Sequence, residues 1–369
     1  MTTHSNDKDE SCTIYNSTPK DLKLLGNKLN KGELVIVPTE TVYGIAGNLF
    51  DKNAIENIYK IKKRPITNPL IVHCLGYYDA LSLIKLNELE NSIFSSLIKK
   101  FSPGPITYLV KSSDIIPSYI NNNSGYIAIR FPKNKVFRDL IQYAGVPLCA
   151  PSANLSNKTS STCLEHVYNY FEHKTINIIN DNNYICEHGI ESTIIKIEDN
   201  ILTVMRPGAI LIADLNTFIE SYNKTNKSII LKEYSNETIC PGQFKLHYSP
   251  KKPVYILKLI HFNSSQLEFP IDLKKITHKY LESIVLIDFN SLGFKYKDKF
   301  LGYVDLSKSG DIKEAMFNLY NVFHQTDTIE CSRVLIYDFS FLKNTESIWD
   351  KIVKASGGKI LSIPLELMN

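Results

Sequence analysis

A short stretch near the start of the chain joins an apolar run to hydroxyl, carboxylate and glycine residues. Residues 34–44 read LVIVPTETVYG. The four apolar residues, three of them β-branched, predict a short buried strand that ends at Pro38. Such a strand would bring the hydroxyls of Thr39 and Thr41, together with backbone amides, to one place. This is the arrangement that a binding site for a small charged molecule requires.

A basic cluster, Lys62-Lys63-Arg64, follows at the end of a predicted helix over 52–62. Cations at a helix C-terminus are ordinarily favoured by the helix dipole alone. Here Pro65 and Asn68-Pro69 follow at once, so the backbone turns sharply beside the charges. Fixed cations suit phosphates, because arginine binds them with a planar fork and lysine as a point charge. The cluster therefore predicts an anion-binding site.

Polar residues recur at the ends of other predicted strands. A satisfied buried histidine, a local ion pair or an ordinary turn residue would explain each of them taken alone. An arginine at a strand end could also clamp a carboxylate with two hydrogen bonds. The hydroxyls of Thr39, Thr41, Ser152 and Ser192 and the cations Lys62, Arg64, Arg130 and Arg206 recur at strand or helix ends in one domain, which favours a shared ligand site. For His73 and Asn154, taken alone, a buried histidine and a turn residue are the favoured interpretations. His247 and Tyr248 lie beside prolines in a later segment, where packing alone would also explain them.

Composition narrows the classes of protein. The chain has 369 residues, 43% of them hydrophobic, and a net charge of +4, which fits a folded protein with anionic ligands better than a general nucleic-acid binder. Its seven cysteines show no Cys-x-x-Cys pair, which argues against a disulfide framework or a structural zinc site and favours the cytoplasm. No apolar run reaches the roughly 18 residues of a membrane span.

The elements that must position these residues divide the chain into four parts. Residues 1–12 are polar and predict a flexible tail. Residues 13–213 mix helices and strands without strict alternation, which predicts an α/β domain with a mixed sheet. Residues 214–252 are polar, show no sustained period and predict an interdomain linker or lid. In residues 253–369, three continuous apolar runs and two helices predict a small parallel sheet.

Seven segments, taken in order, resemble the YrdC/Sua5 family of threonylcarbamoyl-AMP synthases, in its long two-domain branch. They are residues 38–44, 62–70, 102–107, 128–132, 150–156, 191–195 and 206–208, and the segment 241–250 resembles the linker of the same branch. The resemblance implies a twisted mixed-sheet YrdC-like catalytic domain followed by a small Rossmann-like Sua5 domain. It also implies synthesis of threonylcarbamoyl-AMP and pyrophosphate from L-threonine, bicarbonate or CO₂, and ATP. The product would pass to the tRNA threonylcarbamoyl transferase machinery that makes t6A at position 37 of ANN-decoding tRNAs.

The resemblance also implies roles for individual residues. L-threonine would contact Thr39, Thr41, His73 and Arg130, with Arg130 on its carboxylate. Lys62, Arg64 and Ser192 would serve the reaction, and the ATP site would comprise Lys62, Arg64, Asn68, Ser152, Asn154, Arg206, His247 and Tyr248. Mg²⁺ would bridge ATP oxygens, with no ligand residues identified and Glu40 as a weak outer candidate. Lys63 departs from the family, which usually has glycine there.

Three alternatives stay open at this point. A YrdC-type domain could bind structured RNA without synthase activity, and direct contact with tRNA is not decided by the sequence. The carbamoyl-transfer branch related to hydrogenase maturation is a weaker alternative, because it carries zinc-finger-like cysteine pairs that this chain lacks. The C-terminal unit could also be purely regulatory, with the linker acting as its lid.

Overall fold

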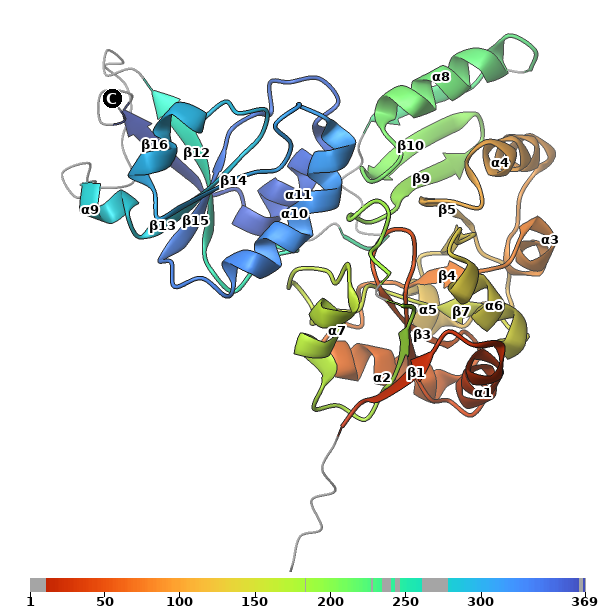
Figure 1. Ribbon diagram of the computed structural model, residues 1–369. Helices are drawn as coiled ribbons and strands as arrows, with labels where there is room; N and C mark the ends of the chain where they lie inside the picture. Colours follow the sequence, from red (N-terminus) through yellow and green to blue (C-terminus); the bar gives the residue numbers. More distant parts are fainter. Residues whose placement is uncertain are drawn as a thin grey trace, which may run out of the picture.

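The fold is taken from a computed structural model that describes residues 11–182, 184–226, 228–233, 240–242, 246–260, 278–364 and 368. Most of the predicted tail 1–12 therefore lies outside the described residues, as does part of the predicted linker. The described chain forms two units, each built on its own sheet (Figure 1).

The first unit is built on an eleven-stranded mixed sheet in the order β1-β8-β2-β3-β7-β4-β6-β5-β9-β10-β11. It contains both parallel and antiparallel pairs, which confirms the predicted mixed sheet. Its strands are β1 Thr13–Asn16, β2 Val35–Val37, β3 Gly44–Asn48, β4 Ile71–His73, β5 Ile106–Lys111, β6 Tyr126–Arg130, β7 Leu148–Cys149, β8 Asn177–Asn180, β9 Thr193–Glu198, β10 Ile201–Arg206 and β11 Ile230–Glu233.

Capping residues set where the main helices of this unit begin. Thr18, Asp51 and Asn87 each accept a hydrogen bond from a backbone amide of the first turn that follows. These helices bury apolar stripes, and the helix over 52–62 begins where the sequence predicts. The helices are α1 Pro19–Leu29, α2 Lys52–Lys62, α3 Tyr77–Ala80, the 3₁₀ turn Leu81–Leu83, α4 Glu88–Phe101, α5 Ser118–Asn121, α6 Lys135–Ala144, α7 Leu164–Phe171 and α8 Ile212–Asn223.

The predicted linker 214–252 is more ordered than its composition suggests. Most of it up to residue 233 belongs to the first unit, because α8 (Ile212–Asn223) buries Leu215, Phe218 and Ile219, and β11 extends the sheet by pairing parallel to β10. The helical spacing of the apolar residues in α8 was not recognised in the sequence because the exposed face of the helix is polar. The described residues 246–253 then lead into the second unit.

The second unit has a five-stranded sheet in the order β14-β13-β15-β12-β16. Every described pair in it is parallel, which confirms the predicted small parallel sheet. Its strands are β12 Val254–Ile260, β13 Ile284–Asp288, β14 Gly302–Asp305, β15 Arg333–Tyr337 and β16 Ile360–Pro364. Its helices are α9 His278–Leu281, the 3₁₀ turn Phe294–Lys299, α10 Ile312–Thr326 and α11 Glu346–Ser356.

Helices α10 and α11 lie on the side of the second sheet that faces the first unit (Figure 1). One apolar cluster joins the two units: Val42, Ile190 and Leu211 of the first unit pack with Tyr248 and with α10 residues such as Leu319. The second unit therefore packs against residues of the first unit that lie close in sequence to Thr41, Ser192 and Arg206 of the predicted site.

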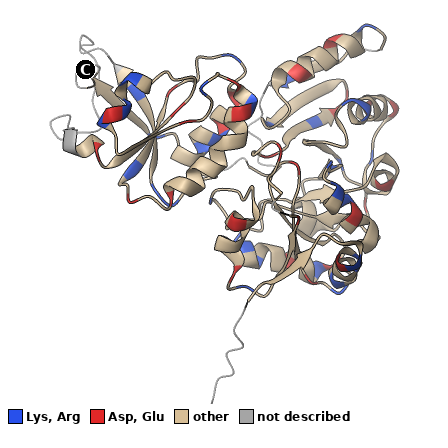
Figure 2. Cartoon of the chain, in the orientation of Figure 1, with Lys and Arg blue, Asp and Glu red and all other residues tan. Residues whose placement is uncertain are grey.

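Charged residues are distributed over both units. Figure 2 shows basic and acidic residues interspersed on the elements of each unit in this view. None of the helices in the described part of the chain has the length and apolar content needed to cross a membrane.

Candidate active site

One open cavity gathers most of the predicted site residues. It lies where β2, β4, β6 and β10 end, and Pro241, Gly242, His247 and Tyr248 also line it. The predicted residues that line it are Thr39, Thr41, Arg64, His73, Arg130, Ser152, Ser192, Arg206, His247 and Tyr248. Three predicted residues, Lys62, Asn68 and Asn154, lie behind its wall.

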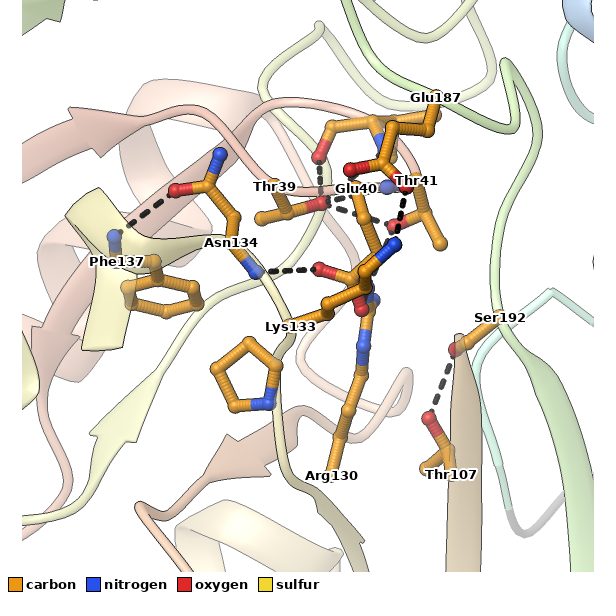
Figure 3. Close-up of polar contacts among 12 residues, drawn as sticks. Thr39, Glu40, Thr41, Thr107, Arg130, Lys133, Asn134, Phe137, Glu187 and Ser192 are labelled. Carbon is orange, nitrogen blue, oxygen red and sulfur yellow. Dashed lines mark hydrogen bonds and ion pairs between the residues drawn. The ribbon is translucent and has the colours of Figure 1, made fainter. Parts of the chain in front are cut away.

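Arg130 forms a buried ion pair at the end of β6 (Figure 3). Its Nη2 donates to Oε1 of Glu40 at 2.8 Å and to Oγ1 of Thr41 at 2.9 Å. The other carboxylate oxygen of Glu40 accepts from the amide of Asn134 at 3.3 Å. Burial raises the pKa of Glu40, but the charge and hydrogen bonds of Arg130 outweigh burial and lower it. The pair is therefore charged at neutral pH, and Glu40 orients the arginine that faces the cavity.

The loop after β2 is held by its own hydroxyl. Oγ1 of Thr39 donates to the carbonyl of Val42 at 2.7 Å and accepts from the amides of Thr41 and Val42. The loop is also fixed from outside, because the amide of Tyr43 donates to the carbonyl of Ser161 at 2.8 Å. The hydroxyl of Thr39 thus stabilises the loop, whereas the hydroxyl of Thr41 accepts a hydrogen bond from Arg130.

His73 ends β4, where the sequence predicts it, and its ring packs at 5.0 Å from that of Phe137. Its Nδ1 has no hydrogen-bond partner among the described residues. Burial, and then the charge of Arg130, lowers the pKa of His73 well below its usual value. The imidazole is therefore neutral, with one ring nitrogen left to a ligand.

The ammonium of Lys62, predicted to bind phosphate, contacts backbone carbonyls of the turn after β7. Its ammonium donates to the carbonyl of Ser152, in a short contact, and to that of Asn154 at 2.6 Å. Burial and the nearby Arg64 lower its pKa well below the usual value. Lys62 thus holds the turn that carries Ser152 from behind the cavity wall.

Arg64 reaches the cavity because Asn68 holds it. Its Nη2 donates to Oδ1 of Asn68 at 2.6 Å and to the carbonyl of Pro69 at 2.8 Å. Burial lowers the pKa of Arg64 to about 10, so it is still charged at pH 7. Lys63 caps α2 in the left-handed region at φ 50°, which explains why glycine suits this position.

Arg206 and Ser192 form a connected group at the ends of β10 and β9. Arg206 Nη2 donates to the carbonyl of Ser192 at 2.9 Å and to its Oγ at 3.1 Å. The same hydroxyl lies 2.8 Å from that of Thr107 (Figure 3). Thr107 was missed by the sequence analysis, because a threonine inside a strand gives no signal of its own.

His247 and Tyr248 cross the cavity and are fixed by the second unit. The amide of His247 donates to the carbonyl of Lys354 at 3.1 Å, and the Tyr248 ring stacks on Tyr320 of α10 at 5.7 Å. The ammonium of Lys351 lies 5.3 Å from the centre of the Tyr248 ring. Burial and the surrounding cations lower the pKa of His247 well below its usual value.

Glu191 is the one acidic residue among the described residues that line the cavity. It begins the segment 191–195 that resembles the family, and the resemblance implied no role for it. The part of the chain that the structure describes holds no group of three or more His, Cys, Asp or Glu residues suited to a metal ion.

Comparisons with known proteins agree with this architecture. A family model named Sua5_yciO_yrdC and described as telomere recombination matches residues 27–208. A second model, described as the C-terminal domain of threonylcarbamoyl-AMP synthase, matches residues 210–357. The two models together span both units.

Individual relatives carry the same name. The threonylcarbamoyl-AMP synthase of Pyrococcus abyssi is 28% identical over 94% of this chain and 92% of its own length. A putative threonylcarbamoyl-AMP synthase of Methanocaldococcus jannaschii is 33% identical, over 53% of this chain and 89% of its own length. The crystal structure of P. abyssi Sua5 complexed with L-threonine superposes with a TM-score of 0.75 at 24% identity, covering 95% of this chain and 99% of that one. By both its domains and its relatives, this chain belongs to the two-domain Sua5 branch of the threonylcarbamoyl-AMP synthase family.

Proposed function

We propose that this chain is an L-threonylcarbamoyladenylate synthase. Threonine, bicarbonate and ATP give threonylcarbamoyl-AMP, pyrophosphate and water. The threonine nitrogen attacks the carbon of CO₂ or bicarbonate, and an oxygen of the resulting carbamate attacks the α-phosphorus of ATP as pyrophosphate leaves. Both relatives described above are named for this activity, and this chain covers most of the length of each.

One observation carries the proposal: a single cavity is lined by three arginines, each held in place by hydrogen bonds. Arg130 is fixed by Glu40, and Arg64 and Arg206 are fixed by Asn68 and Ser192. An amino acid and a nucleotide each bring an anionic group to such a site, and arginine forks bind both carboxylates and phosphates.

The threonine end would lie against Thr39, Thr41, His73 and Arg130. The free nitrogen of the neutral His73 and the Nε of Arg130, which has no partner among the described residues, suit the polar groups of a small amino acid. Arg130 would bind the carboxylate while Glu40 holds it in place. Thr39 would act by shaping the loop.

The nucleotide end would lie against Arg64, Ser152, Ser192, Arg206, His247 and Tyr248. Lys62, Asn68 and Asn154 would act from behind, by holding the turn and Arg64. Fixed cations there would offset the charge that builds on the α-phosphate as the carbamate attacks. Mg²⁺ would enter with ATP on its phosphate oxygens. His247 and Tyr248 would exclude water from the mixed anhydride product.

We further propose that the product serves t6A formation at position 37 of ANN-decoding tRNAs, through a separate threonylcarbamoyl transferase. No contact between tRNA and this chain is needed for that step, because the product is a small molecule.

The test is pyrophosphate release by the full chain with ATP, threonine and bicarbonate, read together with chromatographic detection of threonylcarbamoyl-AMP. Matched reactions omit threonine or bicarbonate, or replace threonine by valine, which has a similar shape without the hydroxyl. We expect release to depend on all three substrates. Pyrophosphate release that is the same without threonine would overturn the proposal.

A further inference from the structure

The carboxylate of Glu191 is held on both oxygens. Oε1 accepts from the hydroxyl of Ser160 at 2.6 Å, and Oε2 accepts from the hydroxyl of Tyr320 at 2.8 Å. All three side chains are buried, and Tyr320 is 0% exposed. Tyr320 comes from α10 of the second unit, 129 positions away in the chain, so this hydrogen bond crosses between the two units.

The same tyrosine contacts the segment that covers the cavity. Its ring stacks on that of Tyr248 with centroids 5.7 Å apart and an interplanar angle of 29°. Tyr320 therefore touches two cavity-lining residues at once, Glu191 through its hydroxyl and Tyr248 through its ring.

Arginines line the same cavity as the Glu191 carboxylate. Arg206 is bonded to the backbone carbonyl of Ser192, the next residue along the chain, and Arg64 lines the same cavity. An unrestrained carboxylate here would pair with one of these guanidinium groups, because oppositely charged groups attract strongly away from water. Such a pair would occupy a cation that a phosphate group needs.

We propose that Tyr320 is a positioning residue that keeps Glu191 away from the phosphate-binding arginines. The proposal rests on the proposed function, and it gives the second unit a defined task at the site. The Tyr320 hydroxyl anchors Oε2 of Glu191, so that Arg64 and Arg206 stay available to the triphosphate. Loss of this hydrogen bond should therefore weaken ATP binding and leave threonine binding unchanged.

The test compares Tyr320→Phe with wild type in ATP and threonine kinetics and in binding of a non-hydrolysable ATP analogue by calorimetry. Phenylalanine keeps the ring stack and removes only the hydroxyl. We expect the KM for ATP and the analogue Kd to rise about tenfold, the cost of one hydrogen bond to a charged group. The KM for threonine should change less than about twofold by the same reasoning.

Two further variants separate this role from a structural one. Tyr303→Phe removes a similar bond, at 2.6 Å to Asp288, within the second unit and should leave both KM values unchanged. In a Glu191→Gln background, where the side chain carries no charge, Tyr320→Phe should change ATP affinity little.

Three outcomes would overturn the positioning role. They are an unchanged ATP affinity in Tyr320→Phe, an equal rise in the KM for threonine, and the same tenfold loss of ATP affinity in the Glu191→Gln background. Turnover that does not depend on threonine would overturn the proposed function, while analogue binding by the same variants would still decide the role of Tyr320. A wild-type chain that does not bind the analogue would overturn both.

Discussion

Glu40 and Arg130 form an ion pair, 2.8 Å between Oε1 and Nη2, in which the carboxylate side chain is 0% exposed and the guanidinium 6%. Charges taken this far out of water are costly unless both are paired and hydrogen-bonded. The amide of Asn134 and the hydroxyl of Thr41 supply those additional bonds. The arrangement fixes one face of Arg130 and leaves its Nε without a partner among the described residues.

Glu40→Gln tests whether this pair serves threonine binding. Glutamine keeps an oxygen for Arg130 but removes the charge that orients it, so we expect threonine affinity to fall about tenfold and unfolding free energy to fall by about 2 kcal/mol. Calorimetric titration with threonine and urea unfolding measure the two effects. The control is Glu187→Gln, which breaks an exposed pair with Lys133 of the same 2.8 Å length, where we expect no change in affinity. Wild-type threonine affinity in Glu40→Gln would contradict the assignment.

Lys62→Met tests the turn that carries Ser152. The substitution removes the donor to two carbonyls and a cation behind the cavity wall. We expect kcat/KM for ATP to fall about a hundredfold, as when a fixed electrostatic donor is lost from an active site. Lys60→Met, on the exposed face of the same helix, is the matched control. Equal kinetics in the two variants would show that Lys62 has no part in the reaction.

Much of the site could be predicted, because its residues stand at the ends of strands and helices with clear patterns. The helix 52–62 has the bounds that the sequence predicts, and His73, Arg130 and Arg206 end strands as expected. The order of strands along the sheet was not accessible in this way. Strand β3 (Gly44–Asn48) also escaped, since its two glycines give it the composition of a loop.

The partners of the site residues could not be predicted, because they depend on contacts distant in the chain. Glu40 is 90 positions from Arg130, and Lys62 is 92 from the carbonyl of Asn154. A lysine beside a turn predicts an anion site equally well whether its ammonium faces the ligand or the backbone. The contact of the Lys62 ammonium with the carbonyl of Asn154 could be found only from the fold.

A stacked pair of buried histidines should make the stability of the chain depend on pH. His166 and His324 lie across the boundary of the two units, with ring centroids 3.7 Å apart and an interplanar angle of 14°. Burial lowers the pKa of His166 to about 3 and that of His324 to about 4, and each histidine is further lowered by a neighbouring positive charge, His324 and Lys251 respectively. The edge of the Tyr170 ring also packs on His324.

The direction of the change in stability with pH follows from the pKa of a histidine in the unfolded chain, about 6.5. Between that pH and about 4, the unfolded chain binds more protons than the folded one, so stability falls as pH falls. At pH 5 each histidine should cost about 2 kcal/mol. His324→Gln keeps a donor for the carbonyl of Ser160, and we expect it to lose less stability than wild type between pH 7 and pH 5 in urea unfolding. His173→Gln, at an exposed histidine, serves as the control, and a pH dependence of His324→Gln equal to that of wild type would refute the pair's role.

Gly189 is the point where α10 meets the segment that carries Glu191 and Ser192. A Cβ at this position would lie 2.4 Å from the carbonyl oxygen of Phe317, which is closer than any real contact. Backbone atoms cannot rotate aside, so Gly189→Ala must move α10 away from the first unit and with it the anchors of His247 and Tyr248. We expect kcat to fall at least about tenfold and proteolysis between the units to become faster. Gly145→Ala is matched in backbone angle, φ 67° against 68°, but its Cβ would meet nothing within 4 Å, so it isolates the cost of the angle alone. If the two variants lose activity and protease resistance equally, the contact between α10 and this segment is not what holds the second unit in place over the cavity.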